Sequence, residues 1–328
     1  MKYLWLDDES SNGPKQKASD ELRLIKGISK SSIFLNVKGK DIWSFLNTDV
    51  FPRIDAYDII LIDHIFAGTK DSNLTGATVA ESIRDKRNNC PIVAITNVPP
   101  NEIDIHKHNA YDDVIKFAHD MSQKIDYLKS ISEGFRLINK KPPSAVDDLM
   151  KLMKAPKDDY ERIKKIIPHE LKSRMKEPGF ASLFYKWVKF KFMAWPGFVL
   201  NRVWTSTLLG IKENRFDVVE SLFEKTKYKG IFSKASEEHW WQSQIKKTLF
   251  DTLSDEPEML PWKLGHKLPG LTPVDIPICL ACKEKFPEIV AFTDETAKTA
   301  RPMHIKCTEL HKDYESALYF EDVRVMRR

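Results

Sequence analysis

The chain has 328 residues, of which 42% are apolar and 30% are charged, and its formal net charge is +5. This is the composition of an ordinary globular protein. Its longest apolar runs, such as residues 59–62, are far too short to span a bilayer, so a membrane protein is not expected. Met1 leads directly into an apolar segment and two aspartates, which predicts a cytoplasmic protein without a signal peptide.

The first third of the chain alternates short apolar runs with segments of helical periodicity. Strands are predicted at Lys2–Leu6, Ser32–Val37, Ile59–Ile62, Pro91–Ile95 and around Val114 and Ile115, and helices at Ser19–Ile28, Lys40–Leu46, Gly76–Arg84 and Met121–Ile138. Such alternation predicts a parallel sheet with helices on both faces. In sheets of this kind the chemistry gathers at the carboxyl ends of the strands.

Two prolines set a domain boundary after the last of these helices. Lys140 and Lys141 precede Pro142 and Pro143, and proline cannot continue a helix and restrains the residue before it. We therefore expect a first domain at 1–141 with a trailing helix, a mainly helical basic domain at 142–265 and a C-terminal module at 266–328.

Five polar side chains follow the predicted strands in chain order. They are Asp7 and Asp8, then Asp63, Thr96 and Lys116. Because the carboxyl ends of parallel strands share one edge, we expect these side chains to converge. Three carboxylates so close repel one another and need a cation, and Mg²⁺ fits an all-oxygen site. One carboxylate can then act as a nucleophile toward phosphorus, while a hydroxyl and an ammonium stabilise the phosphoryl oxygens.

At these residues the sequence resembles the receiver domain of two-component response regulators. The resemblance covers about residues 1–120 and rests on Tyr3–Glu9, Tyr57–Asp63, Pro91–Thr96, Asp112–Lys116 and the Leu74-Thr75-Gly76 step into a helix. It implies a flavodoxin-like, doubly wound, five-stranded parallel sheet. It further implies Asp63 as phospho-acceptor and Mg²⁺ ligand, Asp7 and Asp8 as further Mg²⁺ ligands, Thr96 as switch hydroxyl and Lys116 as phosphoryl partner. The partner it implies is a sensor histidine kinase or a phosphotransfer protein.

Two positions depart from that family. Phe117 follows the lysine where the family usually has a proline in a cis peptide bond, and since a non-proline cis bond costs about 2.5–4 kcal/mol, we expect this bond to be trans or strained. Asp113 stands where the family often has an aromatic switch residue. The phosphorylation chemistry is therefore expected to be intact, with the usual readout face in question. The alternative is a receiver-shaped scaffold that is never phosphorylated.

Three of the four cysteines and one histidine form two short pairs, Cys279 with Cys282 and His304 with Cys307, separated by 21 residues. Three thiolates and an imidazole suit tetrahedral Zn²⁺, and a four-ligand site is structural because no position is left for water. A helix predicted at Thr308–Tyr319 gives a local resemblance to treble-clef zinc fingers. His311 is the alternative to His304 as ligand, and buried free thiols are the alternative to a metal site. Cys90 is expected in the core.

The basic surplus lies in the middle of the chain. Residues 151–250 contain 21 basic and 11 acidic residues, and five of the eight tryptophans. Lys186–Trp195 interleaves lysines with aromatic residues, which nucleic-acid binding would need. An amphipathic helix whose lysine stems cover apolar surface gives the same pattern and is the favoured interpretation. Glu238 and His239, beside two tryptophans, are expected on a helix face rather than as a catalytic pair.

The sequence thus predicts a response regulator that accepts a phosphoryl group on Asp63, with an output that the sequence does not identify. A nucleic-acid-binding effector acting through residues 151–250, or a protein-interaction adaptor in a signalling or defence system, are the alternatives. A homodimer stays open. An enzymatic output also stays open, although no residues point to one; the only reactions predicted are autophosphorylation and autodephosphorylation of the receiver.

Overall fold

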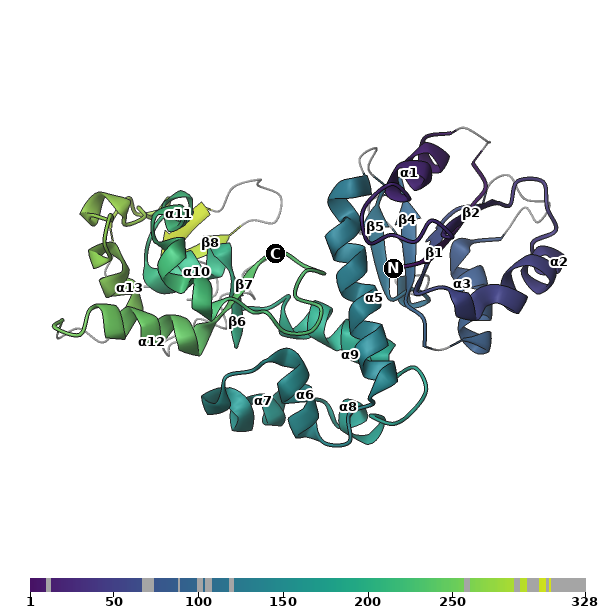
Figure 1. Ribbon diagram of the computed structural model, residues 1–328. Coiled ribbons are helices and arrows are strands. Elements are labelled where there is room, and N and C mark those ends of the chain that lie inside the picture. The colour runs from purple at the N-terminus through teal and green to yellow at the C-terminus, as the bar shows by residue number, and fades with distance from the viewer. Residues whose placement is uncertain are drawn as a thin grey trace. The chain divides into compact units, whose positions relative to one another are not determined.

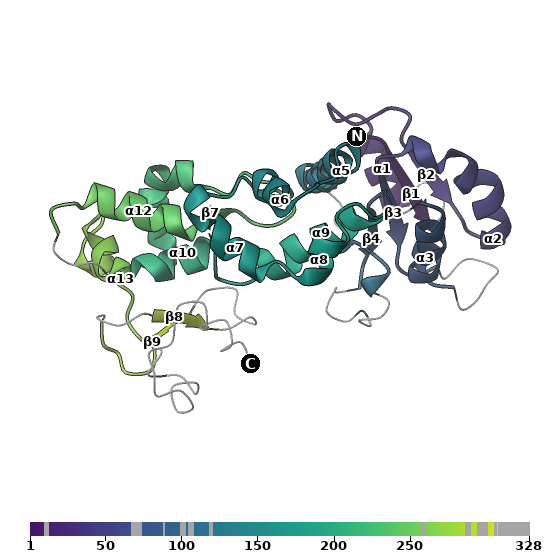
Figure 2. The same cartoon turned by 90° about the horizontal axis from the view of Figure 1, so that it is seen from below.

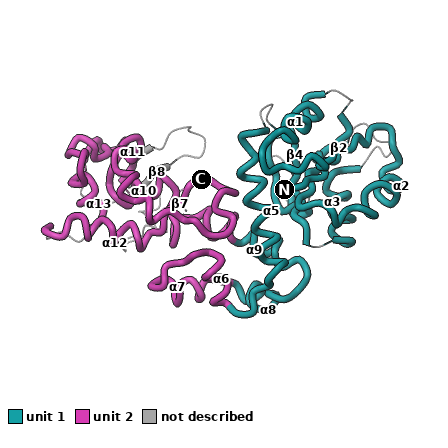
Figure 3. The backbone as a smooth tube through the Cα atoms, in the orientation of Figure 1, with its two compact units in different colours: residues 1–145, 168–187 teal, residues 146–167, 188–328 magenta. Residues whose placement is uncertain are grey.

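A computed structural model describes residues 1–9, 13–66, 74–87, 89–98, 103, 108–117, 121–256, 260–285, 290–293, 301–304 and 307. The chain forms two compact units, one of residues 1–145 and 168–187 and the other of residues 146–167 and 188–328 (Figure 3). The chain thus leaves the first unit after Ala145 and returns to it for one segment, Pro168–Trp187. Among the described residues no helix has the length and apolar content to cross a membrane.

Unit 1 contains a five-stranded parallel sheet. Its strands and helices are β1 (Tyr3–Asp7), α1 (Pro14–Leu22), β2 (Ile33–Asn36), α2 (Ile42–Phe45), β3 (Ile59–Asp63), α3 (Gly76–Lys86), β4 (Ile92–Thr96), β5 (Asp113–Lys116), α5 (Ile125–Lys140), α8 (His169–Ser173) and α9 (Phe180–Trp187). The strand order is β2-β1-β3-β4-β5 and all pairs are parallel. This is the flavodoxin-like doubly wound order, so the predicted fold class is confirmed.

Alternation along the strands divides the core into two layers (Figure 1). Leu4, Leu6, Ile60 and Ile62 pack into one cluster with apolar side chains of α2 and α3. On the opposite face, the Tyr3 hydroxyl donates to the Ser19 carbonyl of α1 at 2.7 Å. Both faces of β1, β3 and β4 are buried throughout, as continuous apolar runs in a parallel sheet require.

The first helix differs from the prediction. A helix was expected over Ser19–Ile28, but α1 begins at Pro14, directly after Gly13, and its last residue is Leu22. Proline is favoured in the first turn, because its fixed φ suits the helix and its missing N–H has no partner there anyway. The earlier start turns Lys15, Ala18, Ser19 and Leu22 onto the buried face.

Unit 2 is mainly helical, as predicted. It contains α6 (Val146–Met153), α7 (Tyr160–Ile166), α10 (Arg202–Leu209), α11 (Phe216–Val219), α12 (Gln242–Thr252) and α13 (Pro261–Leu264), with the antiparallel strand pairs β6 (Val199–Asn201) with β7 (His239–Trp241) and β8 (Val290–Thr293) with β9 (Arg301–His304). Figure 2 shows the β8–β9 pair clearly. His239 therefore lies on a strand, and the expectation that it lies on a helix face was wrong.

Candidate functional site

The carboxyl ends of β1 and β3 bring three aspartates together. Leu6 pairs with Ile62, so Asp7 and Asp63 follow at the same level on neighbouring strands. Asp7 is fully buried, Asp63 is 8% exposed, and Asp8 is half-buried. One carboxylate oxygen from each lies within 4.8 Å of the others. The structure thus brings the three acids predicted from the sequence to one edge of the sheet.

The next two strands carry the other two predicted residues. Thr96 ends β4 and pairs with Lys116 at the end of β5. Thr96 is buried, and its hydroxyl accepts a hydrogen bond from the Val98 N–H at 3.0 Å. Lys116 is exposed and forms no ion pair with any described residue. No described peptide bond is cis, so the bond between Lys116 and Phe117 is trans.

The ammonium in contact with the acidic pocket belongs to Lys15, which the sequence analysis did not single out. Its Nζ lies 2.6 Å from Asp63 Oδ2 and 3.0 Å from Asp7 Oδ2, and its side chain is only 7% exposed. Its position in the sequence could have been recognised from helical spacing, because Lys15 shares the buried face of α1 with Ala18, Ser19 and Leu22. That spacing is invisible when the helix is placed five residues too late.

The turn before α1 fixes the position of Lys15. Oε2 of Glu9 accepts from the Lys15 backbone N–H at 2.6 Å, and the Glu9 N–H donates to Asp7 Oδ1 at 2.9 Å. A Cβ at Gly13 would lie 2.3 Å from the Glu9 carboxyl carbon, so a side chain there would displace the Glu9 carboxylate from this position. The carboxylate of Glu9 thereby satisfies a backbone donor of the first turn and ties the helix start to β1.

The pocket remains short of positive charge despite Lys15. Burial, and then the negative charge of Asp7, raise the pKa of Asp63 to about 6, although Lys15 acts to lower it. Burial likewise raises the pKa of Asp7, again against the effect of Lys15. Oδ2 of Asp7 is buried and, apart from its contact with the Lys15 ammonium, accepts no hydrogen bond of good geometry from a described residue.

These observations fit a divalent cation. Carboxylate oxygens are the ligands that Mg²⁺ prefers, and Asp7, Asp8 and Asp63 present three within one small volume. The buried Asp7 Oδ2 lacks a directed donor, and one ammonium does not offset three carboxylates. The side chains present therefore suit the magnesium site predicted from the sequence.

The start of α3 is pressed against the end of β3. The Gly76 N–H donates to the His64 carbonyl at 2.9 Å, and a Cβ at Gly76 would lie 2.0 Å from the Asp63 carbonyl oxygen. A side chain at this position would push the helix away from the acidic edge. Nδ1 of His64 also lies 3.1 Å from the Tyr111 hydroxyl, which links the segment after β3 to the residues before β5.

Two buried aspartates beside β5 hold the returning helix α9, which packs against α5 within unit 1 (Figures 1 and 2). Asp112 accepts from the Ile92 N–H at 2.7 Å, from Arg84 at 2.6 Å and from the Ser182 hydroxyl of α9. Asp113 accepts from the hydroxyls of Tyr127 and Tyr185. Burial, and then the charge of Asp113, raise the pKa of both tyrosines. The strand that ends in Lys116 is therefore tied at its other end to α9.

The second candidate site is the cysteine-histidine cluster of unit 2. Cys279, Cys282, His304 and Cys307 each place a ligand atom within 4.8 Å of the others. The Cys279 N–H donates to the Glu284 carbonyl at 3.1 Å, and Lys283 takes a positive φ of 64°. This tight turn presents both thiols on the same side, while His304 lies at the end of β9, with Nδ1 3.2 Å from Cys282 Sγ.

The thiols differ in their pKa. Burial acts first to raise the pKa of Cys279, but backbone N–H groups of Cys282, His304 and Ala281 more than offset it and lower the pKa to about 7. Burial and the neighbouring thiols raise the pKa of Cys307 to about 11. Three sulfurs and one imidazole nitrogen form the donor set of a closed tetrahedral zinc site. His311 and the helix expected at Thr308–Tyr319 lie outside the described residues.

The basic and aromatic stretch Lys186–Trp195 begins in α9 and runs on without a break into a π-helical turn. α9 ends at Trp187, and Val188–Phe192 forms a π-helical turn assigned to unit 2. Trp187 and Phe192 are buried in the core, and Lys186 Nζ donates to the Asn109 carbonyl at 2.8 Å. These buried rings are packed as core side chains, so they are not available for stacking on bases.

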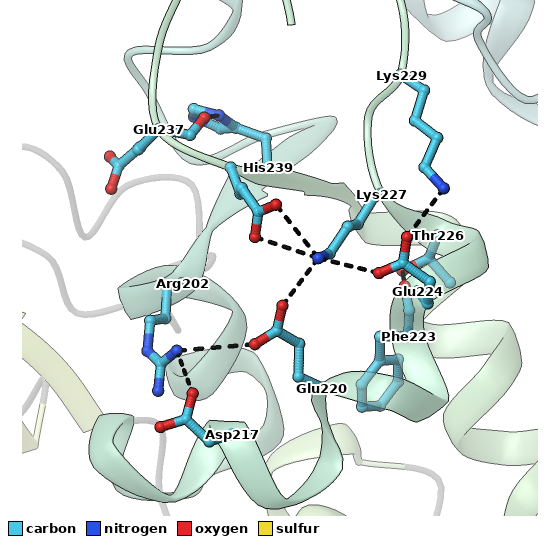
Figure 4. A network of polar contacts seen from close by, with 11 residues as sticks. Arg202, Asp217, Glu220, Phe223, Glu224, Thr226, Lys227, Lys229, Glu237 and His239 are labelled. Atoms are coloured by element: carbon cyan, nitrogen blue, oxygen red, sulfur yellow. Dashed lines mark hydrogen bonds and ion pairs between the residues drawn. The ribbon is translucent and has the colours of Figure 1, made fainter. Parts of the chain in front are cut away.

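A charged network lies on the surface of unit 2 (Figure 4). Lys227 Nζ lies 2.9 Å from Glu220, 3.0 Å from Glu224 and 3.2 Å from Glu238. Glu238 is thus engaged with a lysine. The neighbouring His239 is buried, with Nδ1 2.8 Å from the Glu237 carbonyl and Nε2 2.9 Å from the Met193 carbonyl. Both ring nitrogens are held by backbone oxygens, which is the arrangement of a structural histidine.

No protein-family model and no curated protein matches the chain. Among solved structures, the chain is similar to a chain of the complex between the histidine kinase ThkA and the response regulator TrrA. The two sequences are 18% identical, the match covers 39% of this chain and 97% of that chain, and the TM-score is 0.27. RcsB from Salmonella enterica serovar Typhimurium, bound to promoter rprA in the presence of the phosphomimetic BeF3-, shows 17% identity over 56% of this chain and 98% of that chain, with a TM-score of 0.28. Because both TM-scores are below 0.5, the flavodoxin-like fold of residues 1–116 is assigned from the strand order of the chain itself.

Proposed function

We propose that the chain is a phospho-accepting signalling protein in which Asp63 receives a phosphoryl group from a partner kinase or phosphotransfer protein. The observation that carries the proposal is the convergence of Asp7, Asp8 and Asp63 within 4.8 Å at the carboxyl edge of a β2-β1-β3-β4-β5 sheet. Asp63 ends the central strand and lies close to the half-buried Asp8.

The chemistry assigned to the pocket is an in-line displacement at phosphorus. A carboxylate oxygen of Asp63 bonds to the phosphorus while the bond from phosphorus to the donor's leaving group breaks, and the leaving group departs with the electron pair. Asp7 and Asp8, with Asp63, would hold Mg²⁺, which when bound offsets charge on the acceptor and the phosphoryl oxygens. Thr96 and Lys116, at the ends of β4 and β5, would donate to those oxygens.

Signal transmission would use β5. Lys116 lies at its carboxyl end, and the buried Asp112 and Asp113 at its other end hold Ser182 and Tyr185 of α9. A shift of β5 on phosphorylation would change the environment of α9, which is followed directly by the first residues of unit 2.

The direct test is modification of Asp63. The full-length protein treated with acetyl phosphate and Mg²⁺ is expected to gain the mass of one phosphoryl group, and Asp63→Asn is expected to abolish the gain. Asp58→Asn is the matched control, since Asp58 lies on the same segment but is exposed and accepts from the Lys2 N–H at 2.6 Å. Identical labelling of wild type and Asp63→Asn would contradict the proposal, as would an absence of both labelling and beryllofluoride binding in the wild type.

We further propose that Cys279, Cys282, His304 and Cys307 bind one structural Zn²⁺. The closeness of the four ligand atoms and the lowered pKa of Cys279 support it. Because binding energy at such sites is largely folding energy, zinc would order the segment that carries the ligands. A saturated four-ligand site leaves no position for water, so no catalysis is assigned to it.

Metal analysis of protein purified without added zinc is expected to give about one Zn²⁺ per chain. Cys279→Ser should lose it, together with the hydrogen-exchange protection of residues 277–285. Cys90→Ala is the matched control, because Cys90 is equally buried but lies in the receiver core, where burial raises its pKa to about 12. Zinc-free wild type with a protected segment would refute the site.

A further inference from the structure

The position of Lys15 suggests a role that none of the expected receiver residues has. Its side chain is 7% exposed, and its Nζ lies between the carboxylates of Asp7 and Asp63, at 3.0 and 2.6 Å. These oxygens belong to the same acids that would hold a divalent cation. An ammonium and Mg²⁺ cannot both lie in hydrogen-bond or ligand distance of the same lone pairs without strong repulsion.

The placement of Lys15 is fixed by the local chain. Glu9 accepts from the Lys15 backbone N–H, and Gly13 permits the close approach of Glu9. Pro14 starts α1, so Lys15 falls on the face that also buries Ala18. The ion pairs of this side chain are made by its terminal ammonium, so rotation about the bonds of its flexible stem would release it from the carboxylates.

We propose that Lys15 is a tethered cation that competes with Mg²⁺ for Asp7 and Asp63 and must leave these carboxylates before the divalent ion binds. The inference rests on the proposed function, since it concerns the same pocket. Lys15 then sets the Mg²⁺ concentration at which the pocket becomes ready for a phosphoryl donor. Without bound Mg²⁺, the ammonium limits the repulsion among the three aspartates.

The test is calorimetric titration of the full-length protein with Mg²⁺ alone. Lys15→Met is expected to bind Mg²⁺ on the order of tenfold more tightly than wild type, because the competing charge is gone. Lys15→Arg keeps the charge and should not tighten binding. Lys17→Met, two residues along on the exposed face of α1, is the matched control and should leave the affinity unchanged.

A second measurement covers the case in which Lys15→Met is poorly folded. Added Mg²⁺ should raise the unfolding temperature of Lys15→Met more than that of wild type, because only the variant lacks its own cation. Equal or weaker Mg²⁺ binding by Lys15→Met, or binding by neither protein, would overturn the inference. Tighter binding by Lys15→Met without phosphorylation of Asp63 would support the competition and count against the proposed function alone.

Discussion

Two lysines of this chain lie among carboxylates, in two very different surroundings. Lys15 is almost fully buried between Asp7 and Asp63 at the edge of the sheet in unit 1. Lys227 is also largely covered, at 16% exposure, but the side chains around it are open to water, from 26% exposed for Glu220 to 64% for Glu238. A lysine surrounded by acidic side chains is therefore buried in one unit and bordered by solvated partners in the other.

The pKa of the partner acids shows the difference. Hydrogen bonds from Lys227 and Lys229 lower the pKa of Glu224, as expected for a surface acid that gains cations. Asp63 contacts an ammonium at 2.6 Å, yet burial and Asp7 raise its pKa to about 6. The surface network is balanced by its own lysines, whereas the pocket is not. An under-neutralised acidic pocket is a feature of a functional site and costs stability.

The largest effect is expected on removing the buried lysine. In Mg²⁺-free buffer at pH 7, Lys15→Met should lower the free energy of unfolding by about 3–5 kcal/mol, because it leaves buried carboxylates without a counter-charge. Denaturant unfolding with and without Mg²⁺ measures this. Lys17→Met controls for loss of a lysine from α1. A cost no larger than that of Lys17→Met would mean that Lys15 and Lys227 lie in equivalent surroundings after all.

A second buried acid, held by tyrosine hydroxyls, sharpens the comparison. Asp113 is held by the hydroxyls of Tyr127 and Tyr185. Tyr185→Phe should cost about 1–3 kcal/mol, since a buried carboxylate loses a donor, and should weaken the hydrogen-exchange protection of α9. Tyr160→Phe is the matched control, because the Tyr160 hydroxyl forms no hydrogen bond with any described residue. Equal effects of the two variants would show that Asp113 does not hold α9.

The pH dependence of stability tests the raised pKa of Asp63. Its folded value of about 6 lies above the ordinary 3.8, so the folded state holds the proton more tightly and stability falls as pH rises from about 4 to about 6. Asp63→Asn lacks this loss and should be more stable than wild type by up to about 3 kcal/mol at pH 7 without Mg²⁺. The difference should close below pH 4. A constant difference across this range would show that Asp63 titrates normally.

The smallest effect is expected in the surface network. Lys227→Met should cost about 0.5–1 kcal/mol, since its partners are solvated and exposed ion pairs contribute little. The cost should shrink in high salt, unlike that of Lys15→Met. Lys229 belongs to the same network and its side chain is 59% exposed, so Lys229→Met should leave the free energy of unfolding almost unchanged. A salt-independent cost above 2 kcal/mol for Lys227→Met would remove the contrast between the two lysines.

Much of the fold and of both candidate sites was predictable from the sequence, for local reasons. Continuous apolar runs identify strands buried on both faces, and parallel strands bring their carboxyl ends to one edge, so Asp7, Asp8 and Asp63 had to meet. The spacing of Cys279 with Cys282 likewise fixes two ligands on one turn. These conclusions need only the period of a strand and the reach of a few residues.

Only the tertiary structure decided the contacts between segments that are far apart in the chain. The start of α1 at Pro14, and with it the burial of Lys15 against Asp63, depends on how Glu9 and Gly13 pack at the turn. The return of α9 to Asp113 joins residues 72 positions apart in the sequence. Local periodicity does not predict such pairs. A buried charge is stabilised by the partner that lies next to it in the folded protein, and the position of that partner depends on the packing of the whole unit.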